Sequence, residues 1–426
     1  MGQAVKMAEL AVHGGEPVRR EPMPPRFAVG PEERKMIEEA LAYYQSGGED
    51  PGYQGHFEER YCRAFAEAMD GGYADAVATG TAALYVALAA LDLPQGGEVL
   101  VSPITDPGTL SAIILNRLVP RLADSAPGSY NMGVDEMLTR LTPGTCAVLV
   151  VHAAGRAAGI DGIVAEASAR GLRVIEDCSQ AHGARHSGQP VGTFGDIAAF
   201  STMYRKAHIT GGCGGVVFTR DRELYRRALA HADRGKPRWR PDFDDRDPTG
   251  FLFPALNLHA DELSCAIGLA SLERLPETIR RRTAFVAEAA ELIETRSAAC
   301  RACPHSPDDS PFFHPVLVDA DRLSCTKRTF AEAVRAEGIG LNPHYQYVVC
   351  EWPWVKRYLA DGFDCPNARD IRDRSFNLYL NENYGRREAE DIAVAIAKVE
   401  DYFVVSPGDA VERPAGRLGG GAKGLA

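Results

Sequence analysis

Five short apolar runs in the middle of the chain predict the strands of one sheet. Each run is nearly continuous in Val, Ile, Leu and Ala, as expected for strands whose two faces are both covered. Helical stretches such as TAALYVALAAL (81–91) and GIVAEASARG (162–171) separate several of the runs, which predicts a mostly parallel, doubly wound sheet of the α/β class. The runs are EVLVSP (98–103), TCAVLVVHA (145–153), LRVIED (172–177), DIAAFS (196–201) and GGVVFT (214–219).

The pattern changes on either side of this region. One helix, from Pro31 to Gln45, is predicted in an N-terminal segment rich in Gly, Pro and charged residues. A polar, proline-rich loop is predicted over 235–255, and a long helical run begins at Asp261. A second unit follows, with a strand over 312–319, a helix near 327–337 and a final helix that ends near Phe403.

These patterns predict two domains and a tail. We expect a large domain over 1–275, a smaller α+β domain over 276–405 and a disordered tail, rich in Gly, Pro and Ala, over 406–426. The net charge of −11 argues against nucleic acid as a partner, and no apolar run approaches the ~20 residues that span a membrane. The N-terminus lacks the apolar stretch of a signal peptide, and ten scattered cysteines suit a reduced, cytoplasmic protein. The close pair Cys300 and Cys303 has no second cluster, so we expect no metal site.

A glycine–threonine turn opens the predicted helix in ATGTAALYVAL (78–88). Free backbone N–H groups and the positive end of the helix dipole at such a turn suit a phosphate. A capped helix that binds no ligand explains the same residues when they are taken alone.

Carboxylates end the run VIEDCSQAHGA (174–184), where α/β sheets place their ligands. Asp177 could hold a protonated ring nitrogen of a cofactor, with the polar Gln180 and His182 beside it. A helix cap after the strand is the competing interpretation.

A lysine follows the fourth apolar run, in FSTMYRKAHITGGCGG (200–215). Lys206 could be a surface residue, a phosphate clamp or a nucleophile, because a buried lysine tends to lose its proton and the neutral amine attacks aldehydes. The order of the three motifs along the chain favours the nucleophile. A phosphate turn, a carboxylate at a strand end and a lysine in one sheet are the parts that bind pyridoxal 5'-phosphate.

These motifs resemble the sugar aminotransferases of the DegT/DnrJ/EryC1/StrS family, which have the fold type I architecture of aspartate aminotransferase. The likeness runs from AVHGGEPVR to the final helix and excludes the tail. It implies that Asp177 contacts the pyridine nitrogen, Gln180 packs at the ring hydroxyl and Lys206 forms the Schiff base. The residues that it implies at the cofactor phosphate are Gly80, Thr81, Ala82 and Ser201.

Three further segments carry the resemblance. LNLHADELSCAIGLASLERL (256–275) matches a family stretch whose asparagine, here Asn257, reaches the cofactor phosphate of the neighbouring subunit. The resemblance therefore implies a homodimer with composite active sites. NPHY (342–345) matches an element near the substrate, so His344 and Tyr345, together with His182, are candidate substrate-binding residues. The third segment is CPNARDIRDRSFNLYLNENY (365–384).

Departures from the family pattern affect the cofactor ring and the dimer element. The family usually stacks an aromatic residue on the ring, and the matching position here is Asp106, followed by Pro107 and Gly108. We keep Asp106 as a candidate cofactor contact, although a carboxylate cannot stack as an aromatic ring does. The arginine of the dimer element is His259, and the usual T-T-G-E-G-G turn is T-G-G-C-G-G.

The resemblance implies an aminotransferase that moves an amino group from glutamate or glutamine to a keto sugar, nucleotide-linked or free, or to a keto-cyclitol, in amino-sugar or natural-product biosynthesis. Two alternatives stay open. A pyridoxal-dependent sugar dehydratase is disfavoured because those enzymes carry histidine at the position of Lys206. A pyridoxal-binding regulator is disfavoured because no DNA-binding helix with a basic face is visible.

Overall fold

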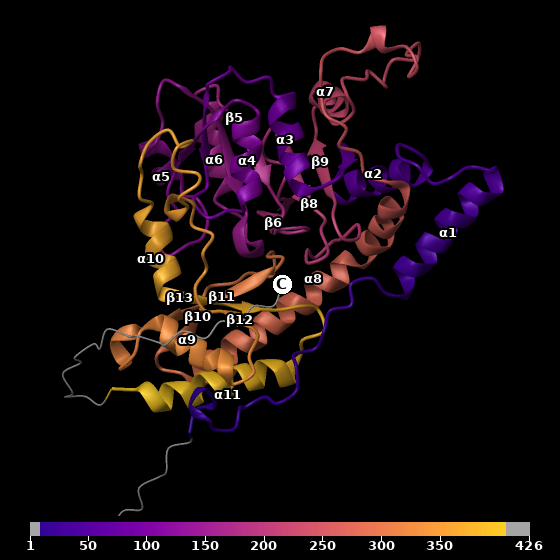
Figure 1. Ribbon diagram of the computed structural model, residues 1–426. Coiled ribbons are helices and arrows are strands. Elements are labelled where there is room, and N and C mark those ends of the chain that lie inside the picture. Colours follow the sequence, from indigo (N-terminus) through magenta and orange to yellow (C-terminus); the bar gives the residue numbers. More distant parts are fainter. Residues whose placement is uncertain (1–8, 406–426) are drawn as a thin grey trace, which may run out of the picture.

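A seven-stranded sheet is the centre of the computed structural model, which describes residues 9–405 (Figure 1). The strand order is β1-β9-β8-β5-β4-β2-β3, and β9 alone runs antiparallel to its neighbours. The sheet is thus mostly parallel, as predicted. Its strands are β1 (Tyr73–Val77), β2 (Glu98–Val101), β3 (Val119–Leu122), β4 (Thr145–Val151), β5 (Arg173–Asp177), β8 (Ile197–Ser201) and β9 (Gly215–Thr219).

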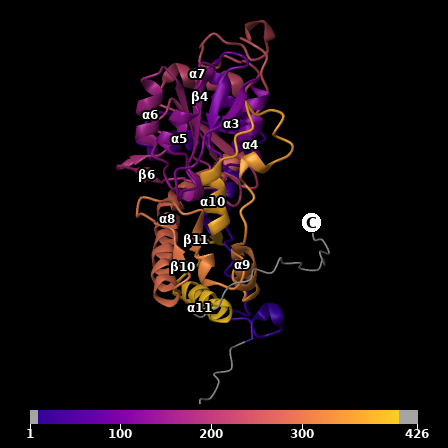
Figure 2. The ribbon, with the colours of Figure 1, turned by 90° about the vertical axis from the view of Figure 1, so that its left-hand side faces the viewer.

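Alternate residues of the strands face two layers of helices. In β4, Leu149 packs in the core beneath α3, α4 and α7, whereas Val148 and Val150 pack beneath α5 and α6. Both faces are therefore covered, which explains the continuous apolar runs. Figure 2 shows α3 and α4 on one side of the sheet and α5 and α6 on the other. The helices are α1 (Pro31–Gly47), α2 (His56–Ala68), α3 (Gly80–Ala90), α4 (Pro107–Leu115), α5 (Val134–Thr139), α6 (Ile160–Ser168) and α7 (Arg222–Ala232).

A second, smaller core lies below the main sheet in Figure 1. Its sheet has the order β10-β11-β13-β12, and all the pairs are antiparallel. The predicted strand over 312–319 is β11, and the helix near 327–337 is α9. The elements are β10 (Cys300–Ala302), β11 (Phe313–Val318), α9 (Lys327–Ala336), β12 (Leu341–Asn342), α10 (Pro366–Arg374), β13 (Ser375–Tyr379) and α11 (Arg386–Phe403).

Helix α8 (Glu262–Arg296) joins the two cores. Asp261 caps it by accepting the backbone N–H of Ser264 at 2.9 Å, as the start of the predicted helix requires. Its first part packs with α2 on the main sheet, and its last part packs in the second core. The helix is continuous across the expected domain boundary at 275–276, where Pro276 lies inside it.

Two segments pack on a core that is distant from them in sequence. Leu10 lies in the second core, so the N-terminal segment reaches that core before it enters α1. Val348 and Val355, which precede α10, pack in the main core. The predicted disordered tail over 406–426 lies outside the described residues. The minor elements are the hairpin β6 (Arg185–His186) and β7 (Gln189–Pro190) and the 3-10 turns Ala11–His13, Ala153–Gly155, Pro248–Gly250, Ala320–Arg322 and Val349–Glu351. Among residues 9–405, no helix is long and apolar enough to cross a membrane.

Candidate active site

A cavity of about 940 Å³ lies between the main sheet and the second core. The carboxyl ends of β4, β5 and β8 contribute Val151, Asp177 and Ser201 to its wall, so it occupies the edge where ligands of α/β sheets bind. The strands of the second sheet and the segments next to them contribute aromatic and amide side chains from the opposite side. Those residues include Phe312, Phe313, Asn342, Tyr345, Tyr347, Tyr379 and Asn381.

The N-terminus of α3 forms an anion cradle in this wall. Thr79 caps the helix by accepting the N–H of Ala82 at 2.9 Å. Within residues 9–405, the N–H groups of Gly80 and Thr81 form no hydrogen bond, so they are free to bind an anion. A Cβ at position 80 would overlap the side chain of Ser201, which shows how closely this serine lies against the helix end. Gly80, Thr81 and Ser201 thus meet at one wall of the cavity, whereas Ala82 lies outside that wall and its amide is used by the cap.

Asp177 is held in place at the end of β5. Its side chain is 3% exposed, and its two oxygens accept the N–H of Ser179 and the hydroxyl of Thr109, both at 3.1 Å. Thr109 lies 2.7 Å from Thr105, oxygen to oxygen, so a short hydroxyl chain fixes its orientation. A buried carboxylate with neutral donors around it is suited to hold a positively charged ring N–H.

Lys206 lies on a loop that is closed at its base. Thr202 and Thr210 join the two ends of the loop through their hydroxyls, 2.6 Å apart, and through a backbone hydrogen bond at 2.9 Å. Gly214 has φ +156°, and a Cβ there would overlap both of those hydroxyls, so glycine is required. After this closed loop, β9 returns antiparallel to β8. The glycine-rich turn that follows the lysine in the sequence is thereby explained.

The side chain of Lys206 is 9% exposed and points into the cavity wall. Its Nζ lies 4.5 Å from the ring centre of Phe312, and within the described chain it forms no hydrogen bond or ion pair. Burial lowers the pKa of the lysine below its usual value, and the carboxylates of Asp177 and Asp106 oppose that shift. An unpaired, desolvated amine is the state that a nucleophile requires.

Asp106 caps α4 and also faces the cavity. Its Oδ1 accepts the N–H of Gly108 at 2.8 Å, and the residue is exposed on the cavity wall. Aromatic side chains reach the cavity instead from β11 of the second sheet and from the segment after β12, where Tyr345 lies 5.1 Å from both Phe313 and Tyr347, ring centre to ring centre. The sequence reasoning did not single out Phe313 or Tyr347, because nothing in their local pattern marks them.

Gln180 and Tyr345 both line the cavity. The Gln180 side-chain oxygen accepts the N–H of Ala154 at 2.8 Å. Burial raises the pKa of the Tyr345 phenol, and a hydrogen bond with Gln180 opposes the shift. The two residues therefore form one polar wall of the cavity.

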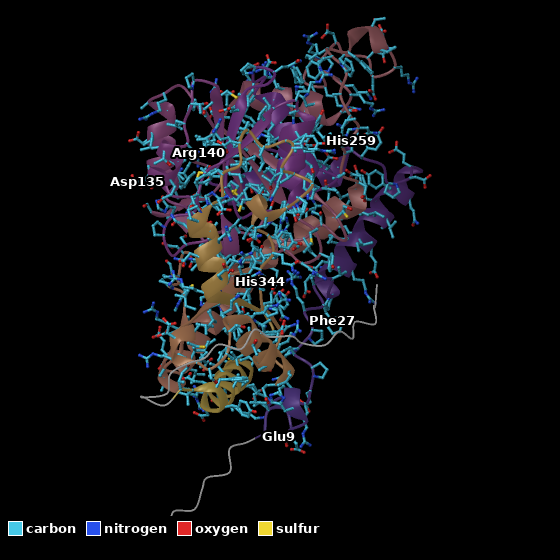
Figure 3. All side chains as sticks on the ribbon, turned by 60° about the vertical axis from the view of Figure 1, so that its left-hand side comes forward. Glu9, Phe27, Asp135, Arg140, His259 and His344 are labelled. Carbon is cyan, nitrogen blue, oxygen red and sulfur yellow. The ribbon has the colours of Figure 1, made fainter. Side chains whose placement is uncertain are left out.

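Three predicted residues lie elsewhere. His182 is buried behind Ser201, donates from Nε2 to its carbonyl at 2.7 Å and has a pKa lowered by burial to about 4. A neutral ring in this place supports the cradle from behind and does not reach the cavity. His344 is half-buried and Asn257 is exposed, and neither lies in the cavity wall. Figure 3 shows His344 well apart from His259.

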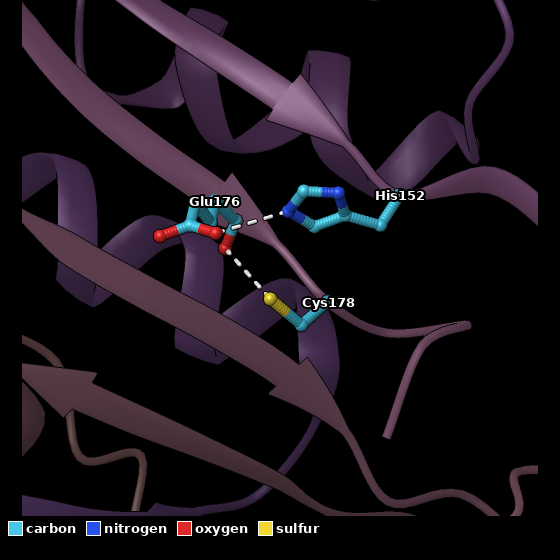
Figure 4. Close-up of side chains that lie close together, drawn as sticks. All are labelled: His152, Glu176 and Cys178. Carbon is cyan, nitrogen blue, oxygen red and sulfur yellow. Dashed lines mark hydrogen bonds and ion pairs between the residues drawn. The ribbon is translucent and has the colours of Figure 1, made fainter. Parts of the chain in front are cut away.

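A second cluster, beside β5, is structural. The atoms of His152, Glu176 and Cys178 that could bind a metal lie within 4.8 Å of one another (Figure 4). Glu176 already accepts three backbone N–H groups and the Nε2–H of His152 at 2.7–3.0 Å. His152 Nδ1 accepts the N–H of Ala158, and burial raises the pKa of the Cys178 thiol. Each group is satisfied by the protein, so the cluster closes a turn and does not offer free ligands.

The residues around the main cavity fit pyridoxal 5'-phosphate. Free N–H groups and a serine hydroxyl suit its phosphate, the Asp177 carboxylate suits its ring nitrogen, and the Lys206 amine suits its aldehyde. The glycine at position 80 leaves the cradle open, because any larger residue would push Ser201 away.

Comparison with known proteins gives the same result. The model of the DegT/DnrJ/EryC1/StrS aminotransferase family matches residues 32–397. A GDP-perosamine synthase of Escherichia coli O157:H7 is 36% identical over 229 residues, which are 54% of this chain and 61% of that protein. An L-glutamine:2-deoxy-scyllo-inosose aminotransferase of Streptoalloteichus tenebrarius is 30% identical over 427 residues, 92% of this chain and 97% of the relative. The X-ray structure of the aminotransferase from Psychrobacter cryohalolentis superposes with a TM-score of 0.81 at 27% identity, covering 89% of this chain and 99% of that one.

Proposed function

The chain belongs to the DegT/DnrJ/EryC1/StrS aminotransferase family, and on this premise we propose that it moves an amino group from glutamate or glutamine to a keto sugar or keto-cyclitol. Its fold is that of the fold type I aminotransferases, and its cofactor is pyridoxal 5'-phosphate. One observation carries the proposal: the unpaired Lys206 amine, the Asp177 carboxylate and the α3 cradle surround one cavity.

The cofactor supplies a reactive aldehyde and a ring that withdraws electrons. Gly80, Thr81 and Ser201 hold its phosphate. Asp177 keeps a proton on the ring nitrogen, and Thr109 orients Asp177. Lys206 Nζ would bind the aldehyde carbon of the cofactor and, when free, would move a proton between the α-carbon of the amino compound and that carbon of the cofactor. Burial lowers the pKa of the lysine, which favours the neutral amine for this role.

The acceptor class follows from the cavity and the relatives. Tyrosine rings and amides line the second-core side, and such walls suit the C–H faces and hydroxyls of a polyol. The inosose aminotransferase aligns along nearly its whole length, which supports a keto-cyclitol, whereas the sugar-nucleotide relative aligns over 61% of its own length. We therefore propose an acceptor of the cyclitol or sugar class. Lys206 stands where the dehydratases have histidine, which disfavours dehydration.

We further propose a homodimer in which Asn257 serves the partner's site. Asn257 is exposed and lies outside its own cavity wall. His259, two residues later, is also outside that wall and pairs with Asp233 at 3.1 Å. A two-fold axis would give two identical composite sites. All ten cysteines are free thiols, which supports our proposal that the enzyme works in the reducing cytoplasm.

Product analysis tests the proposed reaction. The enzyme is incubated with glutamate or glutamine and a panel of keto-cyclitols, free keto sugars and nucleotide-linked keto sugars, and aminated products are identified by mass spectrometry. Lys206→Ala should give no product, and borohydride reduction of this variant should leave no pyridoxyl label on the protein. Lys356→Ala, which changes an exposed lysine, should behave as the wild type. Label on a lysine other than Lys206 would show that the assignment is wrong.

A further inference from the structure

The segment over residues 19–30, here called the N-terminal strap, crosses from the second core to the lysine loop. Arg19 fixes its beginning, because its N–H donates to the carbonyl of Glu337 at 2.9 Å and its side chain pairs with Asp391 at 2.6 Å. Asn381 and Asn383, which follow β13, hold its middle by donating to the carbonyls of Pro24 and Pro25 at 2.9 and 2.8 Å. The strap therefore has a defined path over the cavity.

Arg26 reaches from the strap to the backbone around the lysine. Its Nη1 donates to the carbonyls of Tyr204 at 3.1 Å and Lys206 at 2.5 Å, and its Nη2 donates to Ala207 at 2.9 Å. One planar guanidinium thus fixes three carbonyls that flank the side chain of Lys206. Within residues 9–405, Lys206 Nζ has no hydrogen-bond or ion-pair partner and only the ring of Phe312 beside it, so the position of the amine depends on how firmly its backbone is held.

Arg26 is itself fixed by a carboxylate from the second core. Glu382, 9% exposed, accepts Arg26 Nε at 2.9 Å with one oxygen and the buried Arg282 at 2.7 Å with the other. Arg282 belongs to α8, so the three side chains connect the strap, the lysine loop and the helix that joins the two cores. The next residue, Phe27 (Figure 3), has φ +47°, a conformation that non-glycine residues seldom adopt, and Asn383 holds the carbonyl before it at 3.0 Å.

We propose that Arg26 is a positioning residue which, anchored by Glu382 and Arg282, holds the backbone of the lysine loop so that Lys206 Nζ faces the cavity. The inference rests on the proposed role of Lys206 as the reacting amine. Arg26 contacts the carbonyls of the loop and acts through them. Arg26 also lines the cavity, but its N–H groups donate to Glu382 and to the three loop carbonyls. If positioning is its role, loss of Arg26 should lower kcat far more than it raises KM.

Hydrogen exchange and kinetics test this role with three variants. Arg26→Met removes the donors at similar length, Arg26→Lys keeps the charge with fewer donors, and Arg20→Met is the control, because Arg20 is an exposed strap residue paired with Glu16. In Arg26→Met, amide exchange over 202–210 should rise about tenfold or more while exchange in β4 is unchanged. The kcat should fall about 100-fold with little change in KM, the cost of misplacing a reacting group by ~1 Å. For Arg26→Lys, both the amide exchange over 202–210 and kcat should lie between those of Arg26→Met and the wild type.

The outcomes separate this inference from the proposed function. If Arg26→Met matches Arg20→Met in loop exchange, or loses kcat without any change in loop exchange, the positioning role is refuted. If Arg26→Met does not fold, the same comparison between Arg26→Lys and Arg20→Met decides. If the wild type aminates no acceptor, the proposed function fails. The effect of Arg26 can then still be measured by amide exchange of the loop and by the rate at which pyridoxal phosphate and borohydride label Lys206.

Discussion

Replacing Gly80 by alanine should damage the anion cradle without touching a charged group. A Cβ at this position would lie 2.9 Å from both Cα and Oγ of Ser201. The side-chain carbon Cβ of Ser201 would be closer still, and carbon atoms in contact need about 3.5 Å, so the helix end or the strand end has to move by roughly 1 Å. The N-terminus of α3 and the end of β8 at Ser201 both carry donors proposed for the phosphate, so a shift of either one distorts the cofactor site.

The size of the effect follows from two costs. Overpacking of this kind destabilises a protein by about 1–3 kcal/mol. A displacement of that order weakens at least one charge-assisted hydrogen bond, which is worth about 1.5–3 kcal/mol. Since about 1.4 kcal/mol corresponds to a factor of ten, we expect the affinity for pyridoxal 5'-phosphate to fall by roughly 10- to 100-fold.

Titration of the apoprotein with pyridoxal 5'-phosphate, followed by absorbance or intrinsic fluorescence, measures this loss. Gly47→Ala is the matched control, because Gly47 lies in α1 and a Cβ there meets no atom within 4 Å. Thermal unfolding of both apoproteins separates a general loss of stability from a local one. If Gly80→Ala bound the cofactor as tightly as Gly47→Ala does, the N-terminus of α3 would not be the phosphate site.

Three other changes probe the remaining contacts. Asp177→Asn removes the charge that keeps the ring nitrogen protonated, so it should lower kcat by about 100-fold or more and cofactor affinity by less than about tenfold. An unaltered kcat would show that the carboxylate has a structural role only. Asp106→Phe should cost only the cap of α4, about 1 kcal/mol in unfolding experiments, while the kinetics with acceptors change; identical kinetics with every acceptor would place Asp106 away from the reaction. Mixed dimers refolded from Lys206→Ala and an impaired Asn257→Ala should regain activity, because roughly a quarter of all sites would be intact, and failure despite proven subunit exchange would assign Asn257 to its own chain.

The strands that the sequence predicted are those buried on both faces. All five apolar runs are strands of the main sheet, but β1 and β3 were missed. The first contains the polar Asp75, and the second contains Pro120 and Arg121; both are edge strands, where one side of the ladder is free. β1 is nearly all buried, so it was missed because the buried Asp75 interrupts its apolar run, whereas β3 is buried only at alternate positions.

Site residues could be predicted where one short motif both begins or ends a secondary-structure element and supplies the side chain or amide at the cavity. Gly80 opens a helix and the cradle at once, and Asp177 ends a strand at the cavity. The motif could not separate residues that face the ligand from residues that support it. His182, five positions after Asp177, lies behind Ser201, and the amide of Ala82 is taken by the Thr79 cap.

Arg26 lay beyond prediction for a different reason. It is separated by 180 positions from the carbonyl of Lys206 that it holds, and its anchor Glu382 lies 356 positions away. An arginine before a phenylalanine in a proline-rich segment has no pattern that distinguishes it from a solvated surface residue. The residues proposed for the chemistry of this site therefore lie in contiguous motifs of the main sheet. The rigidity of its reacting amine depends instead on contacts that form only after both cores have folded and the N-terminal strap has packed against them.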